Sequence, residues 1–322
     1  MPLILMAKTI LVTGGAGYIG SVAVKVLVEK GYNVVVIDNL SKGSKELVHK
    51  KAKFYEADLV DDVSLGKVFV ENDINAVIHF ASYKAVEESM KDAVKYSDNI
   101  KGTINLLNQM IKNDVKKIIF SSSAAVYGEP KKGIVDEKSP TKPINFYGFT
   151  KLDCENIIEW YHEIYNLGYV SLRYFNVAGD AGLNYVDPDA KNVLPIIMEV
   201  LFEKRDKLMV FGDDYPTRDG TCIRDYIDVN DLVDAHILAL ETDYNGVINL
   251  GTSNGVSVKE LITLTEEVVG KKIPFIIGKK RPGDPPMLIA SNKLAKKVLG
   301  WEPKRTVKEM IKTTYEAYKN KK

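Results

Sequence analysis

KTILVTGGAGYIG, residues 8–20, is the stretch that decides the fold. Its apolar run at 10–12 is typical of a buried parallel strand, and Gly14, Gly17 and Gly20 follow at intervals of three residues. A helical pattern begins at once, with one apolar face formed by Ile19, Val22, Ala23, Val26 and Leu27. Glycines let the backbone approach a diphosphate closely, and a helix N-terminus supplies unpaired N–H groups and a positive dipole end. The stretch therefore predicts a dinucleotide-binding turn.

A second apolar strand, Val34–Ile37, ends in Asp38, eighteen residues beyond Gly20. A carboxylate at that place accepts hydrogen bonds from an adenosine ribose and repels a 2′-phosphate. The pattern therefore favours NAD over NADP. Without the second strand, the same glycines would fit an ordinary helix-packing turn.

The first half of the chain alternates strands with helical patterns, as a doubly wound parallel sheet requires. Further strands are expected at Lys53–Glu56, Ala76–His79, Lys117–Ser121 and Tyr169–Tyr174, and helices at about 90–113, from Tyr147 to about Tyr165 and at about 307–319. A chain of 322 residues exceeds the size at which one core usually keeps growing. We expect a Rossmann-type α/β NAD-binding domain over residues 1–177, to which residues 226–251 return with the strand–helix pair Tyr226–Val229 and Asp231–Leu240, and a smaller C-terminal substrate-binding α/β domain over residues 178–322.

Composition excludes several classes of protein. Lys and Arg number 44 against 43 Asp and Glu, so the charge balance indicates neither a nucleic-acid partner nor a membrane partner. Cys154 and Cys222 cannot form a disulfide framework, which fits a reducing, cytoplasmic compartment. The four histidines lack metal-ligand spacing, so no metal is expected. The N-terminal MPLIL is too short for a signal peptide, and Met6 is an alternative start.

Tyr147 and Lys151 are four residues apart on a predicted helix and therefore share one face. Lowering a tyrosine pKa from ~10 by ~3 units needs roughly 4 kcal/mol of preferential phenolate stabilisation. A nearby ammonium and the charge of a nicotinamide are the expected sources, and the phenolate would then take a proton from an alcohol as hydride leaves its carbon. Three serines, 121–123, end the preceding strand and offer a hydroxyl to the same oxygen. Alone, the Tyr–Lys pair would fit an exposed helix contact.

Two further positions are expected to face the cofactor from the residues alone. Ligands of such sheets bind beyond the carboxyl ends of the strands, which places the loop after Ala76–His79 there. Asp58 follows the third strand, where a carboxylate lies within reach of an adenine amino group. Asn99 lies within the next helix, and a buried asparagine needs polar partners.

With these residues in view, the chain resembles the extended short-chain dehydrogenase/reductase superfamily and, within it, the UDP-glucose 4-epimerase (UDP-galactose 4-epimerase) family. The resemblance covers nearly the whole chain. Its pieces are TGGAGYIGS (13–21), IDNLS (37–41), VIHFAS (77–82), SSSAAVYGE (121–129), YGFTK (147–151), LRYFNVAG (172–179), FGDDYPTRDGTCIRDYIDV (211–229), NLGT (249–252) and RPGD (281–284). The first five mark the superfamily, and 211–229 and 281–284 contact the sugar nucleotide in relatives.

The resemblance implies three groups of site residues. The catalytic group consists of Ser123 as the hydroxyl, Tyr147 as the base and Lys151 as its modulator. NAD would be held by Gly14, Gly17, Tyr18, Ile19, Gly20, Asp38, Asn39, Asp58, Leu59, Phe80, Ala81, Lys84, Asn99, Tyr147, Lys151 and Tyr174. The UDP-sugar would be held by Lys84, Ser123, Tyr147, Asn176, Asn192, Phe211, Arg224, Tyr226, Arg281 and Asp284.

The resemblance implies reversible inversion at carbon 4 of a UDP-hexose, with NAD bound throughout, by a homodimer that pairs through the helices near 90–113 and 147–165. A dehydratase is a weaker alternative, because dehydratases usually have Thr-Asp-Glu where this chain has Ser123–Ala125, and alanines supply no acid–base pair. A UDP-uronate epimerase and a decarboxylating relative stay open. A non-enzymatic NAD-sensing module is the remaining alternative, although such modules tend to lose the Tyr–Lys pair.

Some positions depart from the family pattern. Asp228 stands where relatives often have histidine. Leu288 stands where epimerases restricted to glucose and galactose have tyrosine and those that accept N-acetylhexosamines have a small residue. Acceptance of UDP-N-acetylhexosamines is therefore left open. For Arg224, the alternative to bidentate diphosphate binding is an ion pair with the adjacent Asp225.

Overall fold

A computed structural model describes residues 8–281 and 283–321, so the alternative start at Met6 and the proline of the RPGD motif lie outside the described residues. The chain divides into two compact units that alternate along the sequence. The first unit comprises the chain up to Ser122, Phe149–Leu172 and His236–Val247, and the second comprises Ser123–Gly148, Arg173–Ala235 and the chain from Ile248. The assignment of residues 1–177 to NAD binding and of residues 178–322 to UDP-sugar binding stays a prediction.

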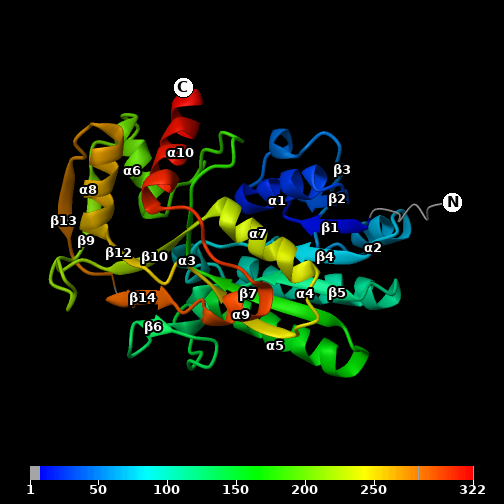
Figure 1. The fold of residues 1–322 in the computed structure, drawn as a ribbon. Helices are drawn as coiled ribbons and strands as arrows, with labels where there is room; N and C mark the ends of the chain where they lie inside the picture. The colour runs from blue at the N-terminus through cyan, green and yellow to red at the C-terminus, as the bar shows by residue number, and fades with distance from the viewer. Residues whose placement is uncertain (1–7, 282, 322) are drawn as a thin grey trace. The chain divides into compact units, whose positions relative to one another are not determined.

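A seven-stranded sheet in the order β11-β7-β5-β4-β1-β2-β3 organises the first unit (Figure 1). Its strands are β1 (Thr9–Thr13), β2 (Asn33–Asp38), β3 (Lys53–Glu56), β4 (Ala76–His79), β5 (Lys117–Ser121), β7 (Gly168–Tyr174) and β11 (Gly246–Leu250). Strand β1 pairs in parallel with both β2 and β4, so the order in which strands are added to the sheet reverses at β1. Ligands of such sheets bind at this switch point. The predicted Rossmann-type fold is confirmed.

The helices of the first unit cover this sheet. They are α1 (Tyr18–Glu29), the 3₁₀ turn η1 (Lys45–Leu47), α2 (Asp62–Val70), α3 (Val86–Ser89), α4 (Ala93–Lys112), α5 (Phe146–Tyr165) and α7 (Val229–Leu240), of which α5 and α7 continue into the second unit. The helix predicted at about 90–113 begins at Ala93, because the Asp92 side chain accepts a hydrogen bond from the Lys95 N–H and caps it.

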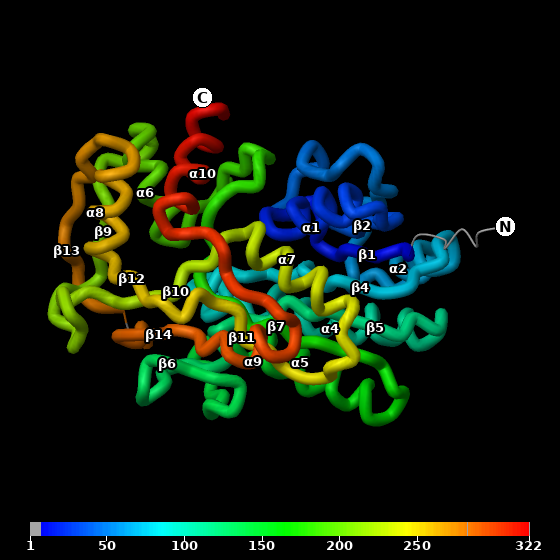
Figure 2. The backbone as a smooth tube through the Cα atoms, in the orientation of Figure 1, coloured from blue at the N-terminus to red at the C-terminus, as the bar shows by residue number. Residues whose placement is uncertain are grey.

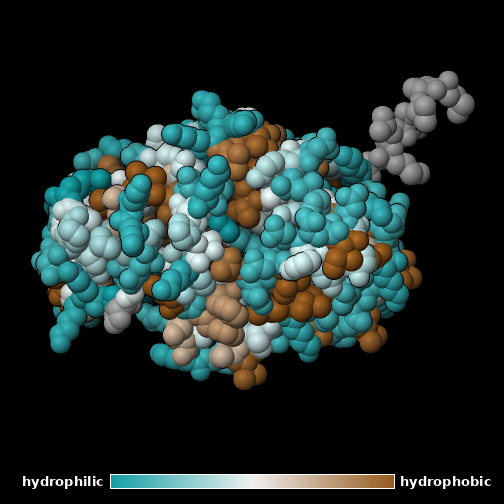
Figure 3. Space-filling model, turned by 90° about the horizontal axis from the view of Figure 1, so that it is seen from below, coloured by the Kyte–Doolittle hydropathy of each residue, from teal (hydrophilic) through white to brown (hydrophobic). Residues whose placement is uncertain are grey.

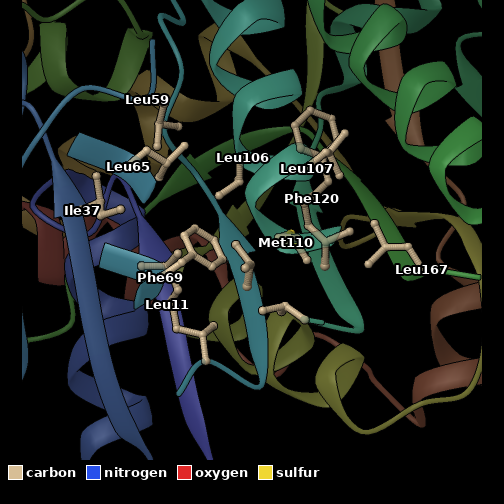
Figure 4. Packing of buried hydrophobic residues seen from close by; sticks show 14 of the residues in the cluster. Leu11, Ile37, Leu59, Leu65, Phe69, Leu106, Leu107, Met110, Phe120 and Leu167 are labelled. Atoms are coloured by element: carbon tan, nitrogen blue, oxygen red, sulfur yellow. The ribbon is translucent and has the colours of Figure 1, made fainter. Parts of the chain in front are cut away.

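The apolar faces of the sheet, α2, α4 and α5 form one core, part of which is shown in Figure 4. Leu11 from β1, Phe120 from β5 and Leu106 from α4 are each at most 1% exposed. Burying such side chains stabilises the fold by about 1.5–3 kcal/mol each. This core fixes the strand ends at which the predicted site residues lie.

Two smaller sheets organise the second unit. One contains β12 (Gly255–Ser257), β10 (Ile223–Asp228), β14 (Met287–Ala290), β6 (Ile134–Val135) and β8 (Asn176–Ala178), and the other pairs β9 (Leu208–Phe211) with β13 (Phe275–Gly278). Its remaining elements are η2 (Ala124–Tyr127), α6 (Val193–Leu201), α8 (Val258–Val269), α9 (Lys293–Leu299) and α10 (Val307–Asn320). Helix α10 packs on α6 and α8, as Figure 2 shows.

The prediction that the strand at Tyr226–Val229 returns to the main sheet is wrong. Strand β10 pairs instead with β8, β12 and β14, while β11 is the later strand that joins the seven-stranded sheet. The buried Asp225 explains this placement, because its carboxylate accepts hydrogen bonds from the backbone of Thr252, Ser253 and Ala290. Those groups come from segments that surround β10 in the smaller sheet.

Across the described ranges, every helix is too short or too polar to cross a bilayer.

Candidate active site

The glycine turn after β1 is built for close approach of backbones. Gly14 has a φ of +71°, and a Cβ there would lie 2.7 Å from the Ala81 nitrogen. A Cβ on Gly20 would lie 2.1 Å from the Gly14 carbonyl oxygen. Gly17 is the N-cap of α1 and makes no side-chain cap hydrogen bond. Tyr18 and Ile19 form the first turn of α1. This turn suits a diphosphate, because its glycines let α1 and the loop after β4 approach it closely, and a helix N-terminus attracts an anion.

Asp38 ends β2 beside the glycine turn. Its carboxylate accepts hydrogen bonds from the Ala16 N–H at 3.0 Å and the Leu40 N–H at 2.8 Å. Burial raises the pKa of this carboxyl, and the two backbone hydrogen bonds oppose that effect. Asn39, the next residue, donates to Asp58 at 2.7 Å, so two of the three residues predicted to hold adenosine are hydrogen-bonded to each other. The remaining acceptor capacity of Asp38 fits a ribose diol.

The loop after β4 lies against the glycine turn. Phe80 stacks on His236, and the Ala81 N–H is hydrogen-bonded to the Thr13 hydroxyl at 3.3 Å. Lys84 is exposed in the same loop, whereas Leu59 is buried in the core of this unit. Thus Phe80 and Ala81 lie at the switch point of the sheet, whereas Leu59 packs in the apolar core of the first unit.

Asn99 is held by hydrogen bonds to protein groups, and its assignment to NAD stays a prediction. Its amide oxygen accepts from the Tyr83 N–H, and its amide nitrogen donates to the Tyr83 carbonyl and to the Thr150 hydroxyl. The side chain therefore clamps the loop after β4 to α4 and α5. These protein partners satisfy the polar atoms of the buried Asn99 side chain.

His79 is a buried residue that the sequence reasoning missed. Its ring nitrogens bond the hydroxyls of Thr13 at 2.7 Å and Thr103 at 3.0 Å, and Thr103 donates to the Asn99 carbonyl. Since Thr103 donates elsewhere, it accepts from the Nε2–H of His79, and Nδ1 accepts from Thr13. Burial, aided by the charge of Lys151, lowers the pKa of His79 to about 3. The imidazole is therefore neutral and links β1, β4 and α4.

This neutral histidine makes stability depend on pH. The unfolded chain binds a proton on His79 below about pH 6.5, and the folded chain does so only near pH 3. The free energy of unfolding should therefore fall with decreasing pH below 6.5, by up to about 1.4 kcal/mol per pH unit from this group. Urea unfolding of His79→Gln between pH 7.5 and 5 should show a shallower slope than the wild type. His49→Gln, at a partly exposed position, is the control; equal slopes in all three proteins would contradict the assignment.

The end of β5 is fixed by α5 through two buried side chains. The Lys151 ammonium donates to the Ser121 carbonyl at 2.9 Å and lies 4.9 Å from the centre of the Phe120 ring. Ser122 donates its hydroxyl proton to the buried Glu155 carboxylate, one helical turn beyond Lys151. Burial lowers the pKa of Lys151 to about 8, and the charges of Cys154 and Glu155 oppose the shift. Glu155 was not among the predicted site residues.

Tyr147 lies one turn before Lys151 on α5 and is hydrogen-bonded to Ser123. Burial raises the pKa of this phenol, and the Ser123 hydrogen bond opposes the rise. The expected lowering of this pKa depends on the positive charge of a nicotinamide as well as on Lys151, and it stays a prediction. Gly148 explains the close packing here, because a Cβ on it would lie 2.6 Å from the Ala125 carbonyl oxygen. Ser123 and Tyr147 are thus brought together within the second unit.

Other residues of the predicted UDP-sugar site lie along the strands of the second unit. Asn176 on β8 is the register partner of Tyr226 on β10. Tyr226 is buried in the apolar core of this unit, and burial raises its pKa. Asn192 is exposed at the N-cap of α6 and makes no side-chain cap. Tyr174, predicted to flank the nicotinamide, is half-buried at the end of β7.

Four predicted UDP contacts form two pairs. The Arg281 guanidinium lies 3.8 Å from the centre of the Phe211 ring, a stacking geometry. Arg224 donates to Asp284 at 2.8 Å and to the carbonyls of Ile223 and Pro285. The alternative pairing of Arg224 with Asp225 is wrong, because the Asp225 carboxylate accepts from Thr252, Ser253 and Ala290.

Comparison with known proteins shows the family to which this chain belongs. A family profile described as GDP-mannose 4,6 dehydratase matches residues 11–314. A UDP-glucose 4-epimerase from Halalkalibacterium halodurans is 47% identical over 92% of this chain and 90% of its own length. The chain belongs to the UDP-glucose 4-epimerase family.

Solved structures of this family agree with the fold. The UDP-glucose 4-epimerase from Brucella ovis in complex with NAD has a TM-score of 0.93 at 39% identity and covers 97% of this chain and 98% of its own. The enzyme from Bifidobacterium longum in complex with NAD+ and UDP has a TM-score of 0.91 at 39% identity, with 98% of both chains covered. The resemblance to the UDP-glucose 4-epimerase family found in the sequence is confirmed.

Proposed function

We propose that this chain is an NAD-dependent UDP-glucose 4-epimerase, an isomerase that interconverts UDP-glucose and UDP-galactose. The observation that carries the proposal is the hydrogen-bonded pair Ser123 and Tyr147, with Lys151 one helical turn beyond Tyr147 on α5. Family membership and the glycine turn after β1 support it. The alanines 124 and 125 argue against the dehydratase activity for which the matching profile is described.

The cofactor fits the residues of the first unit. The glycine turn would hold the diphosphate of NAD, and Asp38 would accept hydrogen bonds from the adenosine ribose. Phe80 and Ala81, in the loop after β4, would line the cofactor. Bound NAD supplies a hydride acceptor at carbon 4 that returns the hydride to the opposite face of the sugar. The cofactor thus ends each cycle oxidised, as an isomerase requires.

The chain's own groups manage the proton. Tyr147 takes the proton of the 4-hydroxyl and gives it back after the sugar has turned, and Ser123 holds the same oxygen through its hydroxyl. Lys151 supplies positive charge one turn away, which favours the phenolate. Since burial raises the pKa of Tyr147, the positive charge of the bound nicotinamide is required as well.

Anchoring of UDP is assigned to the second unit. Phe211 and Arg281 would hold the uracil end, and Arg224 with Asp284 would hold the ribose and diphosphate. The same ligand is assigned to Asn176, Asn192 and Tyr226. Because Tyr226 is buried, we assign it the role of holding β10 in place. Anchoring through the nucleotide leaves the sugar free to present either face.

The experiment that tests this function is direct. Purified chain is incubated with UDP-galactose, without added cofactor or reductant, and products are resolved by NMR. UDP-glucose at its equilibrium fraction supports the proposal. Bound NAD with an unchanged sugar nucleotide contradicts it and favours the NAD-sensing alternative. Conversion of a UDP-uronate instead would favour inversion at carbon 5.

Arg224→Lys should weaken substrate binding rather than chemistry. Lysine keeps the charge but loses the planar fork that binds two phosphate oxygens, and hydrogen bonds to charged groups contribute about 1.5–3 kcal/mol. The KM for UDP-galactose should rise roughly 10- to 100-fold with a smaller change in kcat. Steady-state kinetics check this, with Arg205→Lys as the control because Arg205 forms an exposed ion pair with Glu199. Equal KM values for both variants would contradict the assignment.

A homodimer in a cytoplasmic setting completes the proposal. On α5, Phe149, Trp160 and Ile164 share one face and are 46%, 66% and 63% exposed. Met90 and Val94, before and on α4, are exposed too, and hydrophobic patches are visible on the face in Figure 3. Exposed apolar side chains on and beside these two helices suit pairing with a second copy of this chain. The unpaired thiols of Cys154 and Cys222 fit a reducing compartment.

Light scattering should therefore give twice the chain mass for the wild type and a monomer for Trp160→Glu. Val63→Glu is the control, because Val63 is 83% exposed on α2. A wild-type monomer would contradict the dimer.

A further inference from the structure

Glu155 is a buried acid that the proposed chemistry leaves unused. It is 4% exposed on α5, and its carboxylate accepts the hydroxyl proton of Ser122, which is fully buried at the end of β5. An acid is rarely buried without a paired group, and removing the partner of such a group is costly. Glu155 therefore either serves the local structure or serves its neighbours on α5.

The neighbours of Glu155 are the groups that the reaction needs. Lys151 is one turn before it on the same helix, and Lys151 donates to the carbonyl of Ser121, the residue adjacent to Ser122. Ser123, assigned to the substrate oxygen, follows directly in the chain. Glu155 thus acts at two points on one short segment, on Ser122 by a hydrogen bond and on Lys151 by its charge.

We propose that Glu155 is a positioning residue of this site, which fixes the serine segment at the end of β5 and whose negative charge favours the ammonium form of Lys151. The inference rests on the proposed function, since only a charged Lys151 can support the Tyr147 phenolate.

The charges around Lys151 make this role necessary. The groups that act on the Lys151 ammonium are Cys154 and Glu155 on α5 and neutral His79 on β4, and the centre of the Phe120 ring on β5 lies 4.9 Å from it. Burial pulls the pKa of Lys151 down to about 8, and burial raises the pKa of Cys154 to about 11, so that thiol stays protonated near neutral pH. Among these groups of the described chain, Glu155 is the carboxylate, and its charge opposes the fall in the pKa of Lys151. Without it, the ammonium would lose its proton closer to working pH.

Three substitutions separate charge from hydrogen bond. Glu155→Gln removes the charge and keeps an acceptor, Glu155→Asp keeps the charge, and Ser122→Ala removes the hydrogen bond alone. Glu159→Gln, at an exposed position one turn further along α5, is the matched control. For each protein, the titration midpoint of Lys151 is measured by NMR of [13C]lysine-labelled chain, with the resonance assigned by its loss in Lys151→Met. The pH dependence of kcat/KM for UDP-galactose is measured in parallel.

Glu155→Gln should lower the Lys151 midpoint by about one pH unit and shift the alkaline limb of kcat/KM downward by the same amount. Glu155→Asp should restore both, and Ser122→Ala should lower kcat severalfold with an unchanged midpoint. An unchanged midpoint and alkaline limb in Glu155→Gln would overturn the proposal. If that variant does not fold, a Ser122→Ala protein with wild-type kcat, or a Glu155→Asp protein with a midpoint lowered by one unit, overturns it instead. Because the NMR midpoint does not depend on turnover, a wild type that fails to convert UDP-galactose contradicts the proposed function and leaves the Glu155 result readable.

Discussion

Tyr147→Phe is expected to lower kcat by about 10²- to 10⁴-fold while NAD stays bound, because it removes one oxygen from the group that moves the proton. The ring keeps its buried place at the start of α5, so the fold should be preserved. The residual rate would come from the hydride acceptor and from Ser123. No other described group is assigned to take the proton, and this makes the expected loss large.

The measurement compares turnover of UDP-galactose with the NAD content of the purified proteins. Tyr161→Phe is the control on the same helix, because the Tyr161 hydroxyl donates to Asn108 at a position away from the serine segment. It should retain wild-type kcat. Tyr147→Phe with wild-type turnover would remove Tyr147 from the mechanism, and loss of NAD would show that the phenol serves binding.

Gly20→Ala is expected to abolish NAD binding and to destabilise the first unit by on the order of 3 kcal/mol. The added Cβ would lie 2.1 Å from the Gly14 carbonyl oxygen and 2.9 Å from the Gly15 Cα, and all of these are backbone atoms. Relief requires α1 to move away from the turn that receives the diphosphate. A flexible side chain could yield to such a contact, but this backbone cannot.

Thermal unfolding and NAD content of the purified protein check this expectation. Gly66→Ala, in the middle of α2, is the control, because its Cβ would meet only the flexible Gln109 side chain at 3.3 Å. That variant should keep both stability and cofactor. A Gly20→Ala protein with the wild-type melting temperature and a full complement of NAD would show that the turn is looser than the structure indicates.

The first sheet could be predicted from sequence because its signals are local. The apolar run at 10–12 indicates a strand, and the glycines after it indicate a turn. Asp38 at the end of β2 indicates the ligand. The placement of β10 could not be predicted this way. It depends on Asp225 finding backbone donors at Thr252, Ser253 and Ala290, which are far away in the sequence.

The sequence motifs supply the site residues as predictions, whereas the residues that hold them in place became visible only in the structure. Tyr147, Lys151 and Ser123 follow from spacing and resemblance, whereas His79 and Glu155 carry out their roles through partners on other elements. One signal was present: Glu155 is four residues beyond Lys151, and so lies on the same helix face. Spacing also did not report that Tyr147 is buried, which raises its pKa, or that the Lys151 ammonium donates to the Ser121 carbonyl.

The central claim is that hydrogen leaves carbon 4 as hydride and returns to the same carbon. Incubating the chain with UDP-[4-²H]galactose in ordinary water and examining the product by NMR tests this most directly. We expect UDP-glucose that retains deuterium at carbon 4. Product with the label washed out into water would mean that a proton, not a hydride, is removed, and it would contradict the assignment of Tyr147 and NAD to one reaction.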